Sequence, residues 1–333
     1  MSEPIGPVIR LAPAKLNLTL SVVGRRADGF HDLHSVMVPL ALADVLSLAP
    51  AGAGPDTVHV AGPDTGPPAD NLVLRGIAAG RAAVAAEHGR AVETPSLAAR
   101  LEKRIPVAAG LAGGSSDGAA ALDGSIEAWA TTLPPDARLD AAARVGSDVA
   151  FFLAGGPALV EGRGERVTPL GHVRGAAPGV LLVTPAVASR TSAAFEAFDT
   201  GGDARPADPR STRATSEHLA AELRNGLSAA DLVARAGVLA TANDLGPAAF
   251  QLVAGLLPLR RALSRLLGRP IGVSGSGPTL WALYPSIDQA REEGEFVERA
   301  IDRGELVAPG TAGPFVAATE FAAPHGPAKE DRE

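Results

Sequence analysis

Alternation of hydrophobic and polar residues predicts the first strand of the chain. From Leu16 to Val22 every second residue is apolar, a period-two pattern typical of a strand with one buried face. A helix is expected over residues 72–88, with Asp70 or Asn71 as its N-cap and Gly89 as its stop. Further strands are expected over residues 36–42, 45–48, 57–60 and 97–105.

The rest of the chain mixes short helices with strands. Strands are expected over residues 179–183, 271–274, 279–284 and 314–321. Helices are expected over residues 119–130, 139–153, 189–198, 217–224, 227–235 and 247–267, with a last one running from its cap Ser286 to Arg303. Residues 51–69 and 200–216 are rich in Gly and Pro and are interpreted as surface loops. Strands of antiparallel type mixed with helices favour an α+β fold.

A glycine-rich segment precedes the helix expected at 119–130. Residues 106–117 read PVAAGLAGGSSD, in which small residues allow a backbone to approach an anion closely and the serines can cap a helix. The free N–H groups and positive dipole end of that helix favour phosphate. The segment is neither a Walker loop nor G-x-G-x-x-G. It therefore predicts a phosphate site of a rarer kind.

Composition and charge narrow the class of protein. The 333 residues suggest two domains, assigned to 1–170 and 171–322, with a disordered tail over 323–333. There is no cysteine, so disulfides, thiolate metal sites and a cysteine nucleophile are excluded. The net charge of −7 argues against a nucleic-acid partner. Because neither a signal peptide nor a membrane-spanning run is evident, we expect a cytoplasmic protein with no membrane partner.

Polar residues on the first strand and before a later apolar run are candidates for chemistry. Lys15 and Asn17 lie two apart and share a face, so together they could line a polar cleft. A solvated edge lysine is the simpler interpretation of Lys15 alone. Asp148 begins an apolar run and could be catalytic, but a carboxylate favourable to a helix dipole explains it equally well.

Two turns complete the set of candidates. Arg26–His31 is an Asp-Gly turn followed by Phe30 and His31, for which an exposed turn tip is the simpler interpretation. A metal site at His31 and His34 has little support, because no third ligand accompanies them. Ser274–Thr279 lies between two apolar strands, and free backbone N–H groups there could bind an anion, although a plain hairpin is the alternative.

Taken together and in order, these motifs resemble the GHMP kinase superfamily, and within it the 4-diphosphocytidyl-2-C-methyl-D-erythritol kinases. The resemblance covers most of the chain. It implies an N-terminal domain like ribosomal protein S5 domain 2, a ferredoxin-like C-terminal domain and an active cleft between them. The matching segments are Pro13–Leu18, Arg26–His31, Pro106–Ser116, Ser147–Val149, Asn243–Leu245 and Ser274–Thr279.

The resemblance implies a reaction and roles for the residues that match. It implies transfer of the γ-phosphoryl group of ATP to the 2-hydroxyl of a small molecule, 4-diphosphocytidyl-2-C-methyl-D-erythritol, in the non-mevalonate (MEP) pathway. Asp148 matches the catalytic acid–base residue and Lys15 the catalytic lysine. Asn17 matches a residue that orients the acceptor, and Phe30 and His31 match the cytidine-binding turn.

The same resemblance supplies the remaining site residues. Asn71 and Lys103 fall where the family contacts adenosine, and Phe195 is placed as a second aromatic wall for the base. Mg²⁺ is expected beside ATP, with Ser115 or Ser116 as its ligand. A monomer or weak homodimer is expected. The ATP-phosphate loop comprises Pro106, Val107, Ala108, Ala109, Gly110, Leu111, Ala112, Gly113, Gly114, Ser115 and Ser116.

Two departures and two alternatives accompany the resemblance. Phe30 stands where Tyr is frequent, so stacking on cytosine is kept while a hydroxyl contact is lost. Ala150 stands where Pro is frequent, which is expected to loosen the start of that helix. A mevalonate or homoserine kinase would share the loop but lack the Lys15–Asn17 and Asp28–His31 combination. A non-enzymatic nucleotide-binding protein would have lost Lys15 or Asp148.

Overall fold

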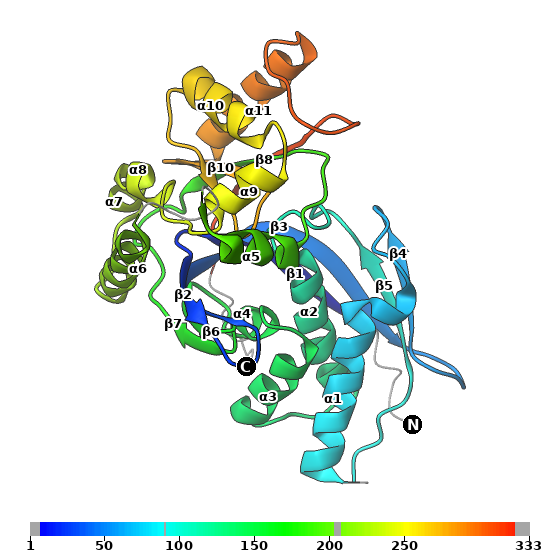
Figure 1. The fold of residues 1–333 in the computed structure, drawn as a ribbon. Helices are drawn as coiled ribbons and strands as arrows, with labels where there is room; N and C mark the ends of the chain where they lie inside the picture. Colours follow the sequence, from blue (N-terminus) through cyan, green and yellow to red (C-terminus); the bar gives the residue numbers. More distant parts are fainter. Residues whose placement is uncertain (1–6, 90, 203–207, 324–333) are drawn as a thin grey trace.

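A single long strand organises the N-terminal half. The computed structural model describes residues 7–89, 91–202 and 208–323, and Figure 1 shows its fold. β3 (His31–Pro50) runs for 20 residues, so the two strands expected at 36–42 and 45–48 are one. Asp44 does not interrupt it, because its carboxylate is buried and accepts hydrogen bonds from the backbone N–H groups of Arg104 and Ile105.

Seven strands form the larger sheet around β3. β1 (Val8–Asn17) and β2 (Ser21–Arg25) pair with one edge of β3, and β5 (Leu97–Glu102) and β6 (Ala158–Gly162) pair with the other, all antiparallel. β4 (Thr57–Ala61) lies parallel to β5, and β7 (Arg166–Pro169) lies antiparallel to β6. β4 confirms the strand expected over 57–60, so the segment 51–69 is not a loop throughout, and it ends in the short 3₁₀ helix η1 (Pro68–Asp70).

The strand expected from Leu16 to Val22 is interrupted. β1 ends at Asn17 and β2 begins at Ser21, because Leu20 pairs with the C-terminal half instead. The Leu20 N–H donates to the Ala242 carbonyl at 2.8 Å, and the Asp244 N–H donates back to the Leu20 carbonyl at 2.8 Å. This exchange joins the first strands to the second half of the chain.

Helices cover one face of the larger sheet (Figure 1). α1 (Leu72–His88) packs on α2 (Gly113–Ala128), which lies on β1 and β3. The helix expected at 72–88 is confirmed, with the Asn71 side chain accepting from the Val73 N–H and Gly89 ending it. α2 begins inside the glycine-rich segment, earlier than expected. The helix expected over 139–153 is in fact two, α3 (Pro135–Val145) and α4 (Val149–Leu153), because the extended backbone of Gly146 ends the first.

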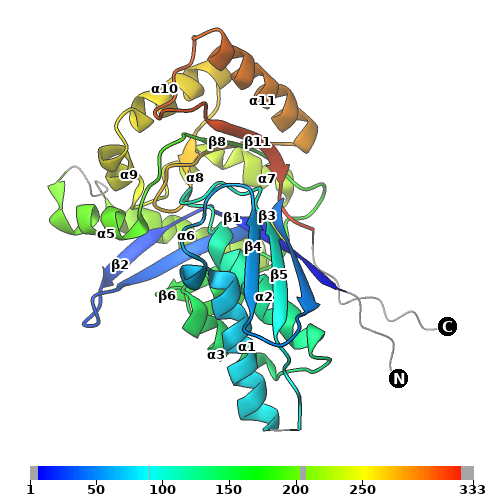
Figure 2. The same cartoon turned by 90° about the vertical axis from the view of Figure 1, so that its right-hand side faces the viewer.

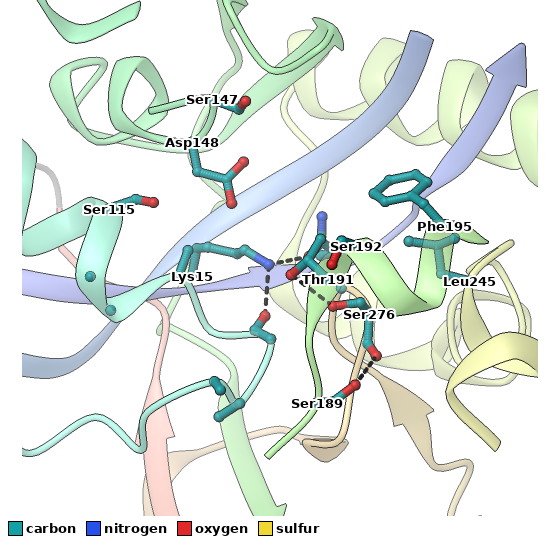
Figure 3. Close-up of a pocket in the computed structure, with 18 of the residues that line it drawn as sticks. Lys15, Ser115, Ser147, Asp148, Ser189, Thr191, Ser192, Phe195, Leu245 and Ser276 are labelled. Atoms are coloured by element: carbon teal, nitrogen blue, oxygen red, sulfur yellow. Dashed lines mark hydrogen bonds between the residues drawn. The ribbon is translucent and has the colours of Figure 1, made fainter. Parts of the chain in front are cut away.

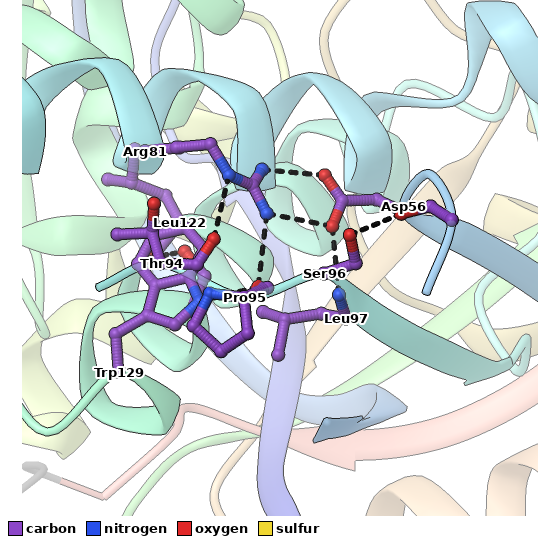
Figure 4. Close-up of polar contacts among 10 residues, drawn as sticks. Asp56, Arg81, Thr94, Pro95, Ser96, Leu97, Leu122 and Trp129 are labelled. Atoms are coloured by element: carbon purple, nitrogen blue, oxygen red, sulfur yellow. Dashed lines mark hydrogen bonds and ion pairs between the residues drawn. The ribbon is translucent and has the colours of Figure 1, made fainter. Parts of the chain in front are cut away.

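A charged contact fixes α1 to the edge of the sheet (Figure 4). The Arg81 guanidinium donates to both oxygens of Asp56, just before β4, at 2.7 and 2.9 Å. It also donates to the backbone carbonyls of Thr94 and Pro95 and lies 4.9 Å over the Trp129 ring. A bidentate pair of this kind fixes orientation as well as distance, so α1 presents its N-terminus at a set position.

The C-terminal half contains a four-stranded sheet in the order β11-β8-β10-β9. Its strands are β8 (Gly179–Thr184), β9 (Gly272–Val273), β10 (Leu280–Tyr284) and β11 (Phe315–Glu320). α11 (Ile287–Asp302), capped by Ser286 as expected, packs on β8 and β11 (Figure 2). The helix expected over 247–267 is divided into α9 (Gly246–Leu252) and α10 (Leu256–Leu267), because Gly255 adopts a φ of 88°.

Four helices follow β8 in the chain, before α9 and the remaining strands of the smaller sheet. They are α5 (Thr191–Thr200), α6 (Pro209–Arg224), α7 (Ala229–Ala234) and α8 (Ala236–Leu239). The loop expected over 200–216 is wrong in its second part, because α6 begins at Pro209 with Asp208 as its cap. Proline suits the first position of a helix, since its missing N–H has no partner there. Residues 203–207 of that expected loop lie outside the described residues.

The two halves share hydrophobic contacts, and the mixture of antiparallel sheets with helices confirms an α+β fold. One buried cluster combines Leu16 and Val36 from the larger sheet with Leu182 and Trp281 from the smaller one. The Ala322 N–H also donates to the Pro39 carbonyl at 2.9 Å. Among the described residues, no helix is long and apolar enough to cross a lipid bilayer. Residues 324–333 of the expected disordered tail, and residues 1–6 searched for a signal peptide, lie outside the described part.

Candidate active site

A cavity of about 760 Å³ lies where the two halves meet (Figure 3). It is lined by β1, the glycine-rich segment, the start of α4, α5 and the turn before β10. The candidate residues it brings together are Lys15, Asn17, Phe30, His31, Asn71, Lys103, Pro106, Val107, Ala108, Ala109, Gly110, Ala112, Gly113, Gly114, Ser115, Asp148 and Phe195. Two predicted residues, Leu111 and Ser116, do not line it.

The glycine-rich segment opens a helix N-terminus to this cavity. Ala108, Gly110 and Ala112 all have positive φ values, of 54°, 78° and 54°. No side chain caps the N-terminus of α2, so the first N–H groups of α2 are free to bind an anion. Leu111 is fully buried in the core and anchors the segment, and its carbonyl accepts from the Lys15 N–H at 3.0 Å. Its side chain is therefore structural.

The two serines of the segment face different spaces. Ser115 lines the main cavity, as Figure 3 shows. Ser116 lines a second cavity of about 310 Å³ on the other side of α2, and its hydroxyl is buried. Of the two proposed ligands for Mg²⁺, only Ser115 therefore faces the space that would hold phosphate.

Lys15 lies at the centre of the site. Its ammonium donates to Asn17 Oδ1 at 2.5 Å and to the Gly110 carbonyl at 2.7 Å. Burial lowers the pKa of Lys15 because it disfavours the ammonium, and the nearby Asp148 carboxylate opposes this shift in part. An ammonium has three N–H donors, so one remains for a substrate or for Asp148.

Asp148 presents its carboxylate to the cavity from the start of α4. It is the N-cap of that helix, yet its side chain makes no capping hydrogen bond. Figure 3 shows it directed toward the Lys15 side of the cavity. No capping hydrogen bond therefore holds this carboxylate away from the cavity, while its place at the start of α4 still suits a helix dipole. Ala150 is buried in α4, and the helix still begins directly after Asp148.

The turn Ser274–Thr279 interlocks with the glycine-rich segment. The Ser274 hydroxyl donates to the Gly110 carbonyl at 3.0 Å, and the Thr279 N–H donates to the Ala109 carbonyl at 3.3 Å. A Cβ at Gly110 would lie 2.3 Å from the Ser274 carbonyl oxygen. The N–H groups of Ser274, Gly277 and Thr279 are all bonded within the protein. The turn thus supports the glycine-rich segment. Gly275 and Ser276 line the cavity, and the expectation that free N–H groups of this turn bind an anion stays a prediction.

Lys103 and Asn71 line the cavity near the glycine-rich segment, and the side chains of both interact with other groups of the protein. The Lys103 ammonium is buried between the carboxylates of Asp44 and Asp117, 2.7 Å from the latter. Burial raises the pKa of Asp117 to about 7, although Lys103 opposes the shift. The Asn71 side-chain oxygen caps α1.

The far end of the cavity is aromatic. His31 and Phe195 are stacked, with ring centroids 4.7 Å apart and planes at 17°. His31 Nε2 lies 2.8 Å from an oxygen of Asp199. Phe30 is half-exposed, and the Arg163 guanidinium lies 5.0 Å from its ring centroid. The predicted aromatic residues therefore lie together at this end, because Phe195 of α5 stacks on His31 of the Arg26–His31 turn.

Sequence reasoning missed several residues of this site. Asp117, Arg163 and Asp199 line the cavity, and Asp44 holds Lys103 from behind it. Asp117 ends the glycine-rich segment, whereas no local motif marks the other three. One compositional signal was available. Of the 30 basic residues only Lys15, Lys103 and Lys329 are lysines, and both that lie in the described part line the cavity. No cluster of three or more His, Asp or Glu residues in the described part could hold a metal.

Comparisons with known proteins agree with this geometry. Residues 71–156 match the model of the GHMP kinases N terminal domain. The chain is 35% identical over 285 residues to a 4-diphosphocytidyl-2-C-methyl-D-erythritol kinase of Pelotomaculum thermopropionicum, covering 86% of this chain and 92% of the relative. It is 38% identical over 289 residues to the kinase of that name from Streptomyces avermitilis, covering 84% and 88%.

Solved structures give the same picture. The crystal structure of a 4-(cytidine 5'-diphospho)-2C-methyl-D-erythritol kinase has a TM-score of 0.65 at 29% identity, over 95% of this chain and all of that one. A homoserine kinase from Cytophaga hutchinsonii has a TM-score of 0.66 at 17% identity over 96% of each chain, which supports the fold alone. The chain therefore belongs to the 4-diphosphocytidyl-2-C-methyl-D-erythritol kinase family of the GHMP kinases, as its motifs indicated.

Proposed function

We propose that the chain transfers the γ-phosphoryl group of ATP to the 2-hydroxyl of 4-diphosphocytidyl-2-C-methyl-D-erythritol, giving the 2-phosphate and ADP in the MEP pathway to isopentenyl diphosphate. The observation that carries the proposal is the shared position of Lys15 and Asp148 in one cavity. The open N-terminus of α2 lies at one end of that cavity and the aromatic turn at the other. A donor and an acceptor can thus meet between them.

The ATP end is formed by the segment 106–116 and its neighbours. Backbone N–H groups from Gly113 onward bind the triphosphate, and the Leu111 side chain holds the segment to the core. Asn71 and Lys103 face the nucleoside side. The Lys103 ammonium is held by the carboxylates of Asp44 and Asp117. We propose that Lys103 contacts the nucleotide while it keeps both of these ion pairs.

The acceptor end is formed by the aromatic residues. Phe30 is half-exposed and offers a ring face on which cytosine stacks. Phe195 supports His31 from the opposite side by stacking, and His31 presents its remaining polar edge to the base. Asn17 lies beside Lys15 at the centre, between the two ends.

The transfer itself follows from the central pair. Asp148 accepts the proton of the attacking 2-hydroxyl. The oxygen of that hydroxyl forms a bond to the γ-phosphorus, and the bond from the γ-phosphorus to the leaving oxygen of ADP breaks. Lys15 has one N–H donor left, which offsets negative charge on the transferred group. Phosphoryl transfer depends mainly on positioning and charge stabilisation, and both groups are held by their backbones at fixed places.

Mg²⁺ fits this site through few protein ligands. Ser115 is its proposed ligand, because its hydroxyl lines the cavity at the N-terminus of α2. Magnesium is commonly bound by one or two protein groups together with phosphate oxygens and water. The ion would neutralise part of the triphosphate charge there. We further propose that the protein acts in the cytoplasm as a monomer or weak homodimer.

Coupled measurement of ADP release tests the proposal. ADP release should depend on the cytidine diphosphate ester and remain at background with mevalonate or homoserine. Asp148→Asn should lower kcat by roughly 10²-fold or more, as expected for loss of a general base. Asp140→Asn, on the exposed face of α3, is the matched control and should keep full activity. Turnover of mevalonate without turnover of the ester would contradict the proposal.

A further inference from the structure

A buried hydroxyl lies behind the central lysine. Ser35 is on β3 next to the end of β1, and its side chain has no exposure to solvent. It accepts a hydrogen bond from Asn17 Nδ2 at 2.8 Å and donates one to the Thr19 carbonyl at 2.6 Å. We infer that Ser35 is a positioning residue for Lys15, acting through the side-chain amide of Asn17. The inference rests on the proposed role of Lys15.

The Thr19 carbonyl, which ends this series of hydrogen bonds, determines which group donates in each of them. A backbone carbonyl can only accept, so the Ser35 hydroxyl proton must point to Thr19. The Ser35 oxygen is then left as an acceptor, which requires the N–H₂ side of the Asn17 amide to face it. The carbonyl side of that amide consequently faces the Lys15 ammonium.

A flipped amide would be unfavourable at this site. It would bring the N–H₂ group of Asn17 against the Lys15 ammonium, placing donors against a positive charge. Asn17 is 2% exposed and Ser35 is fully buried, so water does not replace a lost partner easily. Ser35 therefore selects the amide orientation that holds Lys15.

The space around the ammonium leaves it little freedom otherwise. Lys15 Nζ is held on two sides by Asn17 Oδ1 and the Gly110 carbonyl (Figure 3). A Cβ at Gly275 would lie 3.1 Å from Lys15 Nζ and 3.4 Å from Asn17 Oδ1, so the turn closes a third side. The remaining N–H direction is open to the cavity. Losing the Asn17 acceptor would release the ammonium from this arrangement.

The test removes the hydroxyl and follows both the lysine and the reaction. Ser35→Ala should lower kcat roughly 10- to 100-fold, the size expected for a misplaced catalytic group, while the KM for ATP changes little. In protein labelled with ¹⁵N-lysine, the Lys15 ammonium signal should shift and its pKa should fall below the wild-type value. With only three lysines in the chain, Lys15→Arg assigns that signal.

Two further variants separate positioning from stability. Ser35→Thr keeps the hydroxyl and should restore the wild-type Lys15 signal and most of kcat. Ser125→Ala removes another buried hydroxyl, which donates to the Leu122 carbonyl at 2.8 Å on α2. This control should leave kcat and the Lys15 signal unchanged even if it lowers the melting temperature.

The outcomes distinguish this inference from the proposed function. An unchanged Lys15 signal in folded Ser35→Ala, with kcat within about twofold of wild type, overturns the positioning role. Equal losses in Ser35→Ala and Ser35→Thr overturn it as well, because the hydroxyl would then be irrelevant. If wild-type protein does not turn over the ester, the proposed function fails, whereas the lysine signal still tests whether Ser35 positions Lys15.

Discussion

At the scale of single residues, the chain uses lysine where arginine would not fit. Arginine supplies 27 of the 30 basic residues, since only Lys15, Lys103 and Lys329 are lysines. Lys15 Nζ is a compact donor enclosed by two acceptors, and a planar guanidinium has a different shape and a fixed set of donors. The two described lysines are buried and line one cavity. The rarity of lysine in the composition therefore points to the candidate site.

The protonation of Lys15 gives a first prediction. Burial lowers the pKa of Lys15 below the ordinary range of a lysine, and Asp148 partly opposes this. Because the ammonium is the proposed active form, wild-type kcat should fall at alkaline pH with a midpoint below the ordinary pKa of a lysine. Asp148→Asn removes the opposing charge, so the Lys15 pKa should fall further. Titration of the ¹⁵N-lysine signal in both proteins measures this, and a higher pKa in the variant would contradict it.

The protonation of Asp117 gives a second prediction. Burial raises its pKa from 3.8 to about 7 in the folded state. Between these values the folded protein binds more protons than the unfolded chain, so this group's contribution to stability is present near pH 4 and lost as pH rises through about 7.

Urea unfolding of wild type and Asp117→Asn measures this contribution. Between about pH 5 and about pH 8 the wild type should lose on the order of 1 kcal/mol or more relative to the variant, which cannot titrate at that position. Arg138–Asp123, a partly exposed pair on α3 and α2, provides the control, since Asp123→Asn should keep the wild-type pH slope. Equal slopes for wild type and Asp117→Asn would show that Asp117 ionises normally.

At the scale of elements, the glycine-rich segment depends on its fit against the turn Ser274–Thr279 from the other half of the chain. Gly110 has a φ of 78°, and a Cβ there would lie 2.3 Å from the Ser274 carbonyl oxygen and 2.8 Å from that of Gly277. Both neighbours are backbone atoms, which cannot move aside without moving the turn. Glycine at this position is therefore required twice, by conformation and by contact.

Gly110→Ala is accordingly expected to weaken ADP binding at least tenfold. The matched control is Gly175→Ala, which has a φ of 93° but nothing within 4 Å of the new Cβ. Both variants bear the strain of a positive φ, on the order of 1 kcal/mol, so the difference between them reports the collision with the turn. Calorimetric ADP titration measures it, and equal affinities in the two variants would refute the interlocking role.

The packing of α1 on α2 gives a further prediction at this scale. A Cβ at Gly76 would lie 2.3 Å from the Gly118 carbonyl oxygen. Gly76→Ala should therefore force the helices apart and destabilise the protein by roughly 2 kcal/mol or more. Gly237→Ala on α8 meets only Pro270 at 3.9 Å and should be neutral or stabilising, because alanine favours a helix. Thermal unfolding compares them, and a neutral Gly76→Ala would contradict the close packing.

At the scale of the whole molecule, the two halves are joined by a common core. Leu16 and Val36 from the first half pack in one cluster with Leu182 and Trp281 from the second. The β11 strand adds a contact through Thr319, whose hydroxyl accepts from the Leu42 N–H at 2.9 Å. The boundary between domains 1–170 and 171–322 stays a prediction, and the shared core indicates that the halves depend on each other.

A fragment of residues 1–170 should consequently not fold alone. It would expose Leu16, Val36 and their neighbours, which the second half covers in the full chain, and such a loss of apolar burial is large on the scale of domain stability. Amide NMR spectra of the fragment should show poor dispersion, while the full chain unfolds in one cooperative transition. A well-dispersed fragment spectrum would establish independent domains.

Local patterns determined those features whose cause is local. The helix from Leu72 to His88 with its Asn71 cap and the Ser286 cap of α11 could be predicted, because caps, glycines and period depend on neighbouring residues. The points at which a strand or helix is interrupted were harder to predict. The sequence did not show that Leu20 would pair with Asn243, which divides the first strand, since that partner is remote in the chain.

The sequence by itself determined the family and predicted which residues carry the chemistry, because both depend on ordered local motifs. Only the tertiary structure decided their surroundings. It separated Ser115 from Ser116 on two sides of α2, buried Lys103 between Asp44 and Asp117, and directed the Asn17 amide toward Lys15. The physical reason is that burial, ion pairing and hydrogen-bond direction depend on segments far apart in the chain, which only folding brings together.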